Sequence, residues 1–162
     1  MMDSISSFQL GIDLDVKPSK AQAEAVCAAS VSEFESEDRS DHFVTRDGMT
    51  FAGTHLIIDL WGAKRLDDLA HVESALRDAV EASGATLLHI HLHHFTPNGG
   101  ISGVAVLAES HISIHTWPER NYAALDVFMC GDAIPQRAVP VLDRAFKPSK
   151  IDVDELRRGR VK

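Results

Sequence analysis

The 162-residue sequence has little of several features that mark large classes of protein. It has only two cysteines, Cys27 and Cys130, which make no disulfide framework, so we interpret each as a free thiol. No apolar run approaches the roughly 20 residues of a membrane-spanning helix. The opening residues, MMDSISSFQLGIDLDV, have neither the basic start nor the apolar core of a signal peptide. We therefore expect a cytoplasmic protein without a membrane partner.

Basic residues are also scarce, since 16 Lys and Arg stand against 24 Asp and Glu, for a net charge of -8. Nonspecific nucleic-acid binding depends on Lys and Arg side chains that meet phosphates, so we expect no nucleic-acid partner. A cationic small ligand fits the charge better, although net charge mainly governs solubility. The sequence also has no glycine-rich phosphate-binding loop and no repeat of the length that indicates a solenoid.

The negative charge is concentrated in residues 1–50, which carry 10 acidic and 4 basic residues. The run SEFESEDRSD within this part has the composition of a solvated, flexible segment. The overall hydrophobic content of 44% is ordinary for a globular protein, and the length suffices for one core. We predict an acidic, flexible extension over 1–50 and one folded domain over 51–162.

The folded part alternates between strand and helix patterns. Short apolar or alternating runs predict strands, and apolar residues at helical spacing predict two helices. In chain order these are a strand at 54–62, a helix within 65–84 that ends at Gly84, strands at 86–95, 101–110, 111–117 and 122–130, and a helix within 132–148 that contains Pro140. Helices near both ends of a block of strands favour an α+β two-layer sandwich, with an antiparallel sheet and helices packed on one face. The basic end of the chain, DELRRGRVK, is expected to be peripheral.

The stretch LAESHISIHTWPE carries the densest set of reactive side chains. In a strand, alternate residues share a face, so His111, Ser113, His115 and Trp117 are expected on one side. A hydrolytic triad of Ser110, His115 and a carboxylate such as Asp126 is a poor interpretation. Ser110 and His115 are five residues apart and face opposite sides, and the sequence has no G-x-S-x-G motif.

A row of histidines offers a second candidate site. His89, His91 and His93 alternate onto one face of the strand at 86–95, and imidazole is a common ligand of zinc and iron. No carboxylate or cysteine stands at a clear metal-binding spacing. A polar strand face or an interfacial histidine cluster explains the row better than a metal site.

Four other features have ordinary structural explanations when each is taken alone. Cys130 lies at the end of a strand, where a small buried hydrophobe is the usual role of a free thiol. Ser102 follows the turn PNGG, the aromatic rings of Phe95 and Trp117 fit a core, and Glu119 fits a surface turn.

Together these residues resemble a known family. The run HHFTPNGGISGVAVLAESHISIHTWPERNYAALDVFMCG closely resembles the small prokaryotic S-adenosylmethionine decarboxylases, which are made as proenzymes and use a pyruvoyl group. The similarity covers roughly residues 51–146 and leaves the first 50 residues unmatched. It implies an α+β sandwich that assembles as a dimer of αβ units, with active sites at the interface.

The resemblance also implies a role for each motif residue. The bond between Glu109 and Ser110 is the expected self-cleavage site, which divides the chain into a β chain, 1–109, and an α chain, 110–162. Ser110 is the expected pyruvoyl precursor, and the remaining roles follow by position: His115 and Ser102 act in processing, Cys130 donates the proton in catalysis, and Phe95, Glu119 and Trp117 bind the substrate.

The chemistry gives a reason for this set of residues. Decarboxylation of an α-amino acid leaves electrons that no side chain can absorb, so an electron sink is needed. A pyruvoyl ketone built from Ser110 would supply it, without pyridoxal phosphate and without a metal. The implied product is decarboxylated S-adenosylmethionine, the aminopropyl donor for spermidine synthesis. Three alternatives stay open: a pyruvoyl decarboxylase of arginine or ornithine, an unprocessed inactive homologue, and a histidine-rich metal-binding module.

Overall fold

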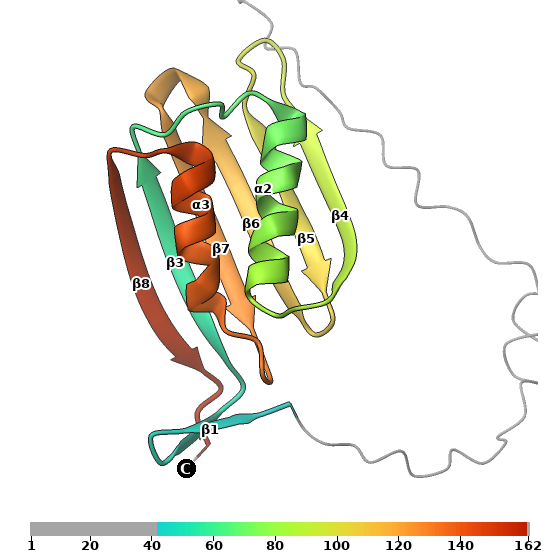
Figure 1. Cartoon of the computed structure of the whole chain (residues 1–162), viewed down its shortest axis with the longest axis vertical. Helices are drawn as coiled ribbons and strands as arrows, with labels where there is room; N and C mark the ends of the chain where they lie inside the picture. Colours follow the sequence, from blue (N-terminus) through green and yellow to red (C-terminus); the bar gives the residue numbers. More distant parts are fainter. Residues whose placement is uncertain (1–41, 162) are drawn as a thin grey trace, which may run out of the picture. The chain divides into compact units, whose positions relative to one another are not determined.

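The computed structural model describes residues 42–161, which form a two-layer α+β sandwich (Figure 1). Six antiparallel strands make one sheet in the order β4-β5-β6-β7-β3-β8, and both helices cover the same face of it. The predicted fold class is therefore confirmed. The elements are β1 (Val44–Arg46), β2 (Met49–Phe51), β3 (Gly53–Trp61), α2 (Leu69–Ala82), β4 (Leu87–His94), β5 (Ile101–Leu107), β6 (Ser110–Trp117), β7 (Tyr122–Met129), α3 (Ala138–Phe146) and β8 (Lys150–Arg158), with short 3-10 helices at Pro118–Arg120 and Pro135–Arg137.

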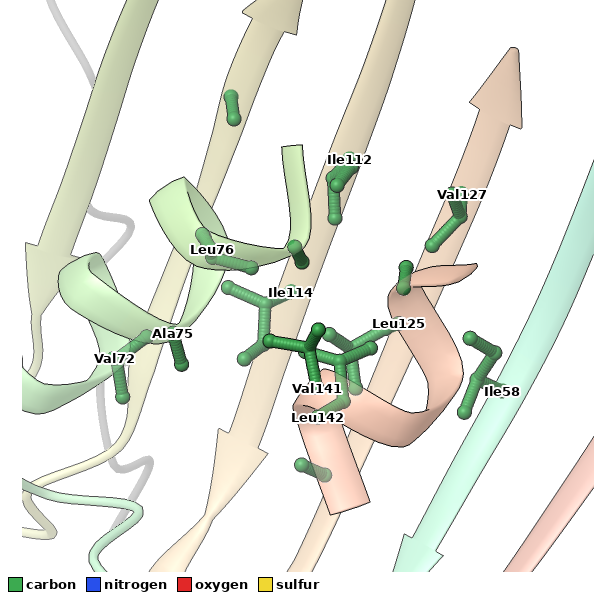
Figure 2. Close-up of a cluster of buried hydrophobic side chains, with 14 of the residues drawn as sticks. Ile58, Val72, Ala75, Leu76, Ile112, Ile114, Leu125, Val127, Val141 and Leu142 are labelled. Atoms are coloured by element: carbon green, nitrogen blue, oxygen red, sulfur yellow. The ribbon is translucent and has the colours of Figure 1, made fainter. Parts of the chain in front are cut away.

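The core lies between the two helices and the sheet. Apolar side chains of both helices meet those of the central strands, as Figure 2 shows for Leu76 and Leu142 next to Ile114 and Leu125. These four side chains are at most 1% exposed. Along β6 and β7 every second side chain is buried, so burial itself alternates with the period of a strand. The opposite set of side chains forms the open face of the sheet, which the helices do not cover.

Both helices begin and end for local reasons. The carboxylate of Asp68 accepts a hydrogen bond from the backbone N–H of His71 and caps the start of α2. At its other end Gly84 adopts a φ of 72°, which confirms the predicted stop at this residue. Pro140 is the third residue of α3. The first four backbone N–H groups of a helix have no hydrogen-bond partner within the helix, so the missing N–H of Pro140 removes no hydrogen bond and does not kink the helix.

Two segments differ from the expectation. Part of the basic end of the chain, residues 154–158, forms the second half of β8, an edge strand paired with β3 along its whole length. Charged side chains on both of its faces hid the strand pattern in the sequence, and such charges are typical of an edge. Residues 44–51 form a small hairpin, β1–β2, and residues 1–41 lie outside the described part. The flexibility of the extension at 1–50 stays a prediction.

The third difference concerns the segment that carries the candidate cleavage site. The runs at 101–110 and 111–117 have no evident turn in the sequence, yet a two-residue turn at Ala108 and Glu109 separates β5 from β6. The turn pairs Leu107 with Ser110 and makes Glu109 adopt a φ of 63°. A left-handed backbone is disfavoured for a glutamate. Alanine and glutamate are also not typical turn residues, so the sequence carries no sign of this turn.

Among the described residues, no helix has the length and apolar content needed to cross a membrane.

Candidate active site

The candidate residues fall into two groups at the two ends of β6. The first group surrounds Ser110, which is 9% exposed. Its Oγ accepts a hydrogen bond of 3.1 Å from the backbone N–H of Cys130, where β7 ends. The peptide bond that precedes Ser110 belongs to the left-handed residue Glu109. The structure therefore brings three predicted residues together around one peptide bond: Glu109, Ser110 and Cys130.

The environment of Cys130 favours the protonated thiol. Burial raises the pKa of this thiol, and the carboxylate of Glu109 raises it further, while a hydrogen bond from Ser110 partly opposes the shift. A thiol with a raised pKa stays protonated at neutral pH and can donate a proton.

A hollow of about 590 Å³ opens beside Ser110. It is lined by residues of β5, β6, β7 and the end of β8, among them Glu109, His111, Phe128 and Arg158. The guanidinium of Arg158 lies 5.5 Å above the Phe128 ring. Burial lowers the pKa of His111, and the nearby His55 lowers it further, so this wall carries a neutral imidazole at neutral pH.

The second group lies at the other end of β6. Ser102 and His115 are cross-strand partners of β5 and β6, and Ser102 Oγ lies 2.9 Å from Nδ1 of His115. This contact orients the imidazole and, within the part of the chain that the structure describes, leaves its Nε2 without a hydrogen-bond partner. The two residues predicted to act in processing are thus in direct contact with each other.

A pocket of about 380 Å³ lies against this pair. The pocket is lined by Phe95, Trp117 and Glu119, together with Ser102 and His115. All three predicted substrate-binding residues therefore line the same pocket. The rings of Phe95 and Trp117 are 48% and 40% exposed, which leaves aromatic surface open to a ligand.

The floor of this pocket uses two residues that the sequence did not single out. The hydroxyl of Thr116 accepts a hydrogen bond from Ile101 N–H and donates one to the carbonyl of Leu66. A side chain at Gly100 would come within 2.9 Å of the Thr116 carbonyl, so only glycine allows the chain to pass this closely. The TPNGG turn was the available signal for Gly100, whereas an isolated threonine on a strand gives none.

The two groups are far apart within one chain. Five residues of strand separate Ser110 from His115, which corresponds to roughly 17 Å at about 3.3 Å per residue. The side chains also lie on opposite faces, because Ser110 is on the helix-covered side and His115 on the open face. A triad with Asp126 is ruled out as well, since that carboxylate contacts Ser113 and His55 instead.

The histidine row lies on the open face, along the edge strand β4. His89, His91 and His93 are exposed, and their cross-strand partners on β5 are Val106, Val104 and Ser102. No three potential metal ligands converge within residues 42–161. The ring of His93 instead contacts Phe95 edge-on, at 4.5 Å between centroids.

An aromatic stack occupies the open face beside the pocket. The Tyr122 ring lies between Trp61 and Trp117, with centroid distances of 4.4 and 5.2 Å. Its hydroxyl donates a short hydrogen bond to Asp59, and this contact raises the pKa of Tyr122 to about 12. The phenol therefore remains neutral and acts as a fixed donor.

The chain is similar in fold and in sequence to known decarboxylases. In fold, the chain is similar to the crystal structure of the adenosylmethionine decarboxylase from Aquifex aeolicus, with a TM-score of 0.63 and 34% identity over 69% of this chain and 94% of that one. In sequence, it is 47% identical to the S-adenosylmethionine decarboxylase proenzyme of Thermomicrobium roseum, over 70% of this chain and 98% of the relative. The proenzyme of the same name from Methanococcus maripaludis is 52% identical, over 66% and 89%.

The family model for S-adenosylmethionine decarboxylase matches residues 54–159. This range contains both ends of β6 and the whole six-stranded sheet except the first residue of β3. The chain belongs to the S-adenosylmethionine decarboxylase family.

Proposed function

We propose that this chain is a self-processing decarboxylase that converts S-adenosylmethionine to its decarboxylated form and CO2. The carrying observation is the arrangement at the β5–β6 turn, where the Ser110 hydroxyl is held by Cys130 N–H next to a left-handed Glu109. A serine placed between a disfavoured peptide and a protonated thiol suits a proenzyme that makes its own pyruvoyl group. The product is an aminopropyl donor for spermidine synthesis.

Processing begins at the hydroxyl of Ser110. Its Oγ attacks the carbonyl carbon of Glu109, the C–N bond breaks, and the hydroxyl proton ends on the Ser110 nitrogen, which leaves an ester. The left-handed φ of 63° at Glu109 makes the starting peptide less favourable and so helps this uphill shift. A hydroxyl such as that of Ser102 stabilises the oxyanion.

A base then removes the α-proton of Ser110. The ester leaves as the carboxylate of Glu109, and the dehydroalanine that remains takes up water and loses ammonia. His115 suits the role of base because imidazole is the commonest general base in enzymes and its Nδ1 is already engaged by Ser102. The fragments have 109 and 53 residues.

The separation along β6 leads us to infer a second copy of the chain at the active site. Neither Ser102 nor His115 can reach Ser110 of its own chain, so we assign these two residues to the partner in a dimer of αβ units. The open face supports this assembly, because it carries five exposed apolar side chains: Ile57, Trp61, Val106, Trp117 and Leu156. In such a dimer the pocket end of one copy meets the Ser110 end of the other.

The substrate fits the pocket by its chemistry. Phe95 and Trp117 offer open ring faces for an adenine and, through cation–π contact, for a sulfonium. The carboxylate of Glu119 lines the same pocket and would accept hydrogen bonds from ribose hydroxyls. The hollow of about 590 Å³ beside Ser110 would take the amino-acid end of the substrate.

Catalysis divides between the pyruvoyl group and Cys130. When present at position 110, the ketone supplies the electron sink for loss of CO2. The raised pKa of Cys130 keeps its thiol protonated, and the thiol then protonates the substrate α-carbon. This chemistry uses neither pyridoxal phosphate nor a metal, and a free thiol in this role suits the reducing cytoplasm.

Two measurements on the purified protein test the proposal. Denatured intact mass should give fragments of 109 and 53 residues, and carboxyl-labelled S-adenosylmethionine should release CO2. Ser110→Ala is the matched control and should do neither. Release of CO2 from arginine or ornithine alone would assign a different substrate, and a stable full-length chain without activity would indicate an inactive homologue.

A further inference from the structure

His42 lies two residues before β1 and outside the range 54–159 that the family model matches. It nevertheless contacts both segments that flank the candidate cleavage site. Its Nε2 lies 3.1 Å from Oε1 of Glu109, and its backbone carbonyl accepts a hydrogen bond of 3.1 Å from Gly131 N–H. One residue therefore bridges the β5–β6 turn and the end of β7.

These contacts close a ring around the scissile peptide bond. From Glu109 the ring runs through the imidazole and backbone of His42 to Gly131. It continues through Cys130, whose N–H donates to Ser110 Oγ, and returns along the chain to Glu109. The residue that carries the attacked carbonyl, Glu109, and the segment that binds the attacking hydroxyl of Ser110 thus both contact His42.

Glu109 needs such a restraint more than its neighbours do. Its φ of 63° is disfavoured for a side chain larger than glycine. Its side chain is 58% exposed, so packing does little to hold it, and the imidazole of His42 provides a polar contact. Rotation of Glu109 toward the ordinary backbone region would turn the carbonyl that Ser110 must attack.

We propose that His42 is a positioning residue for self-cleavage, because its imidazole holds the Glu109 side chain and thereby orients the Glu109 carbonyl. The inference deepens the self-processing proposed above and rests on it. In the step that it assists, the bond from Ser110 Oγ to the Glu109 carbonyl carbon forms as the C–N bond breaks. The hydroxyl proton passes to the Ser110 nitrogen, and His42 exchanges no atom.

Substitution of the side chain separates this role from a structural one. The contact with Gly131 is made by the backbone of His42, so it survives in His42→Ala, whereas the contact with Glu109 is lost. His42→Gln places an amide N–H2 close to the position of Nε2 and keeps a donor toward Glu109. Arg46→Ala, an exposed position in the adjoining β1, is the matched control.

The experiment follows cleavage of the full 162-residue chain after cell-free synthesis, with translation stopped and samples separated on a denaturing gel. We expect His42→Ala to slow cleavage by roughly threefold to tenfold, as for the loss of one hydrogen bond in a transition state. His42→Gln and Arg46→Ala should remain within about twofold of the wild type. Thermal unfolding of purified His42→Ala should match that of Arg46→Ala.

A double-mutant cycle measures the coupling between His42 and Glu109, which a general structural effect of His42→Ala would not produce. In the background of Glu109→Ala the partner is absent, so His42→Ala should have no further effect on the rate. Equal slowing in both backgrounds, no slowing in either, or a His42→Gln variant as slow as His42→Ala would overturn the inference. A wild-type chain that never cleaves would instead overturn the proposed function.

Discussion

The two ends of β6 differ in how they hold their reactive groups. At the first end Ser110 is almost fully buried and its hydroxyl is fixed by a backbone N–H of a neighbouring strand. At the other end His115 is exposed on the open face, oriented by one hydroxyl and bordering a pocket with aromatic walls.

This contrast separates two tasks. The buried end fixes a peptide bond in one geometry, which suits a reaction that occurs once in each chain. The exposed end offers surface and an imidazole nitrogen to a group that comes from elsewhere. We expect each end to be inactive alone, and variants at the two ends should fail in different ways.

Ser110→Ala should have the largest effect. Without the hydroxyl there is no nucleophile for the shift and no precursor for the ketone, so both cleavage and decarboxylation should be abolished. Intact mass and release of CO2 measure the two losses separately. Residual turnover by an uncleaved Ser110→Ala chain would contradict the proposed chemistry.

Mixing variants from the two ends tests whether they meet between copies. His115→Ala should cleave poorly alone. When it is co-expressed with a tagged Ser110→Ala chain, its own Ser110 meets an intact His115 from the partner, so cleavage should return in mixed dimers. Mass spectrometry distinguishes the chains by the tag. If His115→Ala stays as uncleaved with the partner as without it, the ends do not act across copies.

Cys130→Ala should separate processing from turnover. The backbone N–H that holds Ser110 remains, so cleavage should proceed, while loss of the proton donor should lower kcat by about 100-fold. Gel analysis and CO2 release on the same sample give both values. Full activity in Cys130→Ala would remove the thiol from the mechanism.

Phe95→Ala should affect only the pocket end. Loss of a stacking ring should raise KM for S-adenosylmethionine by about tenfold, with little change in cleavage. Leu88→Ala is a suitable control, because Leu88 is 64% exposed on the same strand, β4, and does not line the pocket. Equal KM values for the two variants would place the adenine elsewhere.

The pH dependence of turnover should show the smallest effect. A donor is active while protonated, so activity should fall as the pH rises through the pKa of Cys130. Burial raises that pKa, so the basic limb of kcat should lie at a higher pH than for an exposed thiol. The limb should be lost or displaced in Cys130→Ser, and an unchanged limb would assign it to another group.

The fold was largely predictable because its signals are local. Apolar periodicity located the strands around β3 and β4 and the helix α2, and Gly84 marked the end of that helix. The turn at Glu109 was missed because its left-handed backbone is imposed by strand pairing on both sides rather than by residue type. The strand β8 was missed for a related reason, since pairing with β3 holds it in place despite charges on both faces.

For the candidate site, the sequence named a set of residues but not their arrangement. The resemblance named Ser102 and His115, and their 2.9 Å contact required the register between β5 and β6. Alternation along a strand already placed Ser110 and His115 on opposite faces. The bridge at His42 carried no sequence signal, because it depends on a segment that returns to the sheet from outside the matched range.

The strand order has a consequence for what remains after the backbone is cut. Residues 1–109 contribute β4, β5 and β3 to the sheet, and residues 110–162 contribute β6, β7 and β8. In the order β4-β5-β6-β7-β3-β8 the fragments interleave, so that β3 of one lies clamped between β7 and β8 of the other. Cleavage between Glu109 and Ser110 would open one hairpin and would leave every ladder of the sheet in place. The two polypeptides would therefore share one sheet, and we expect them to dissociate only when the domain unfolds.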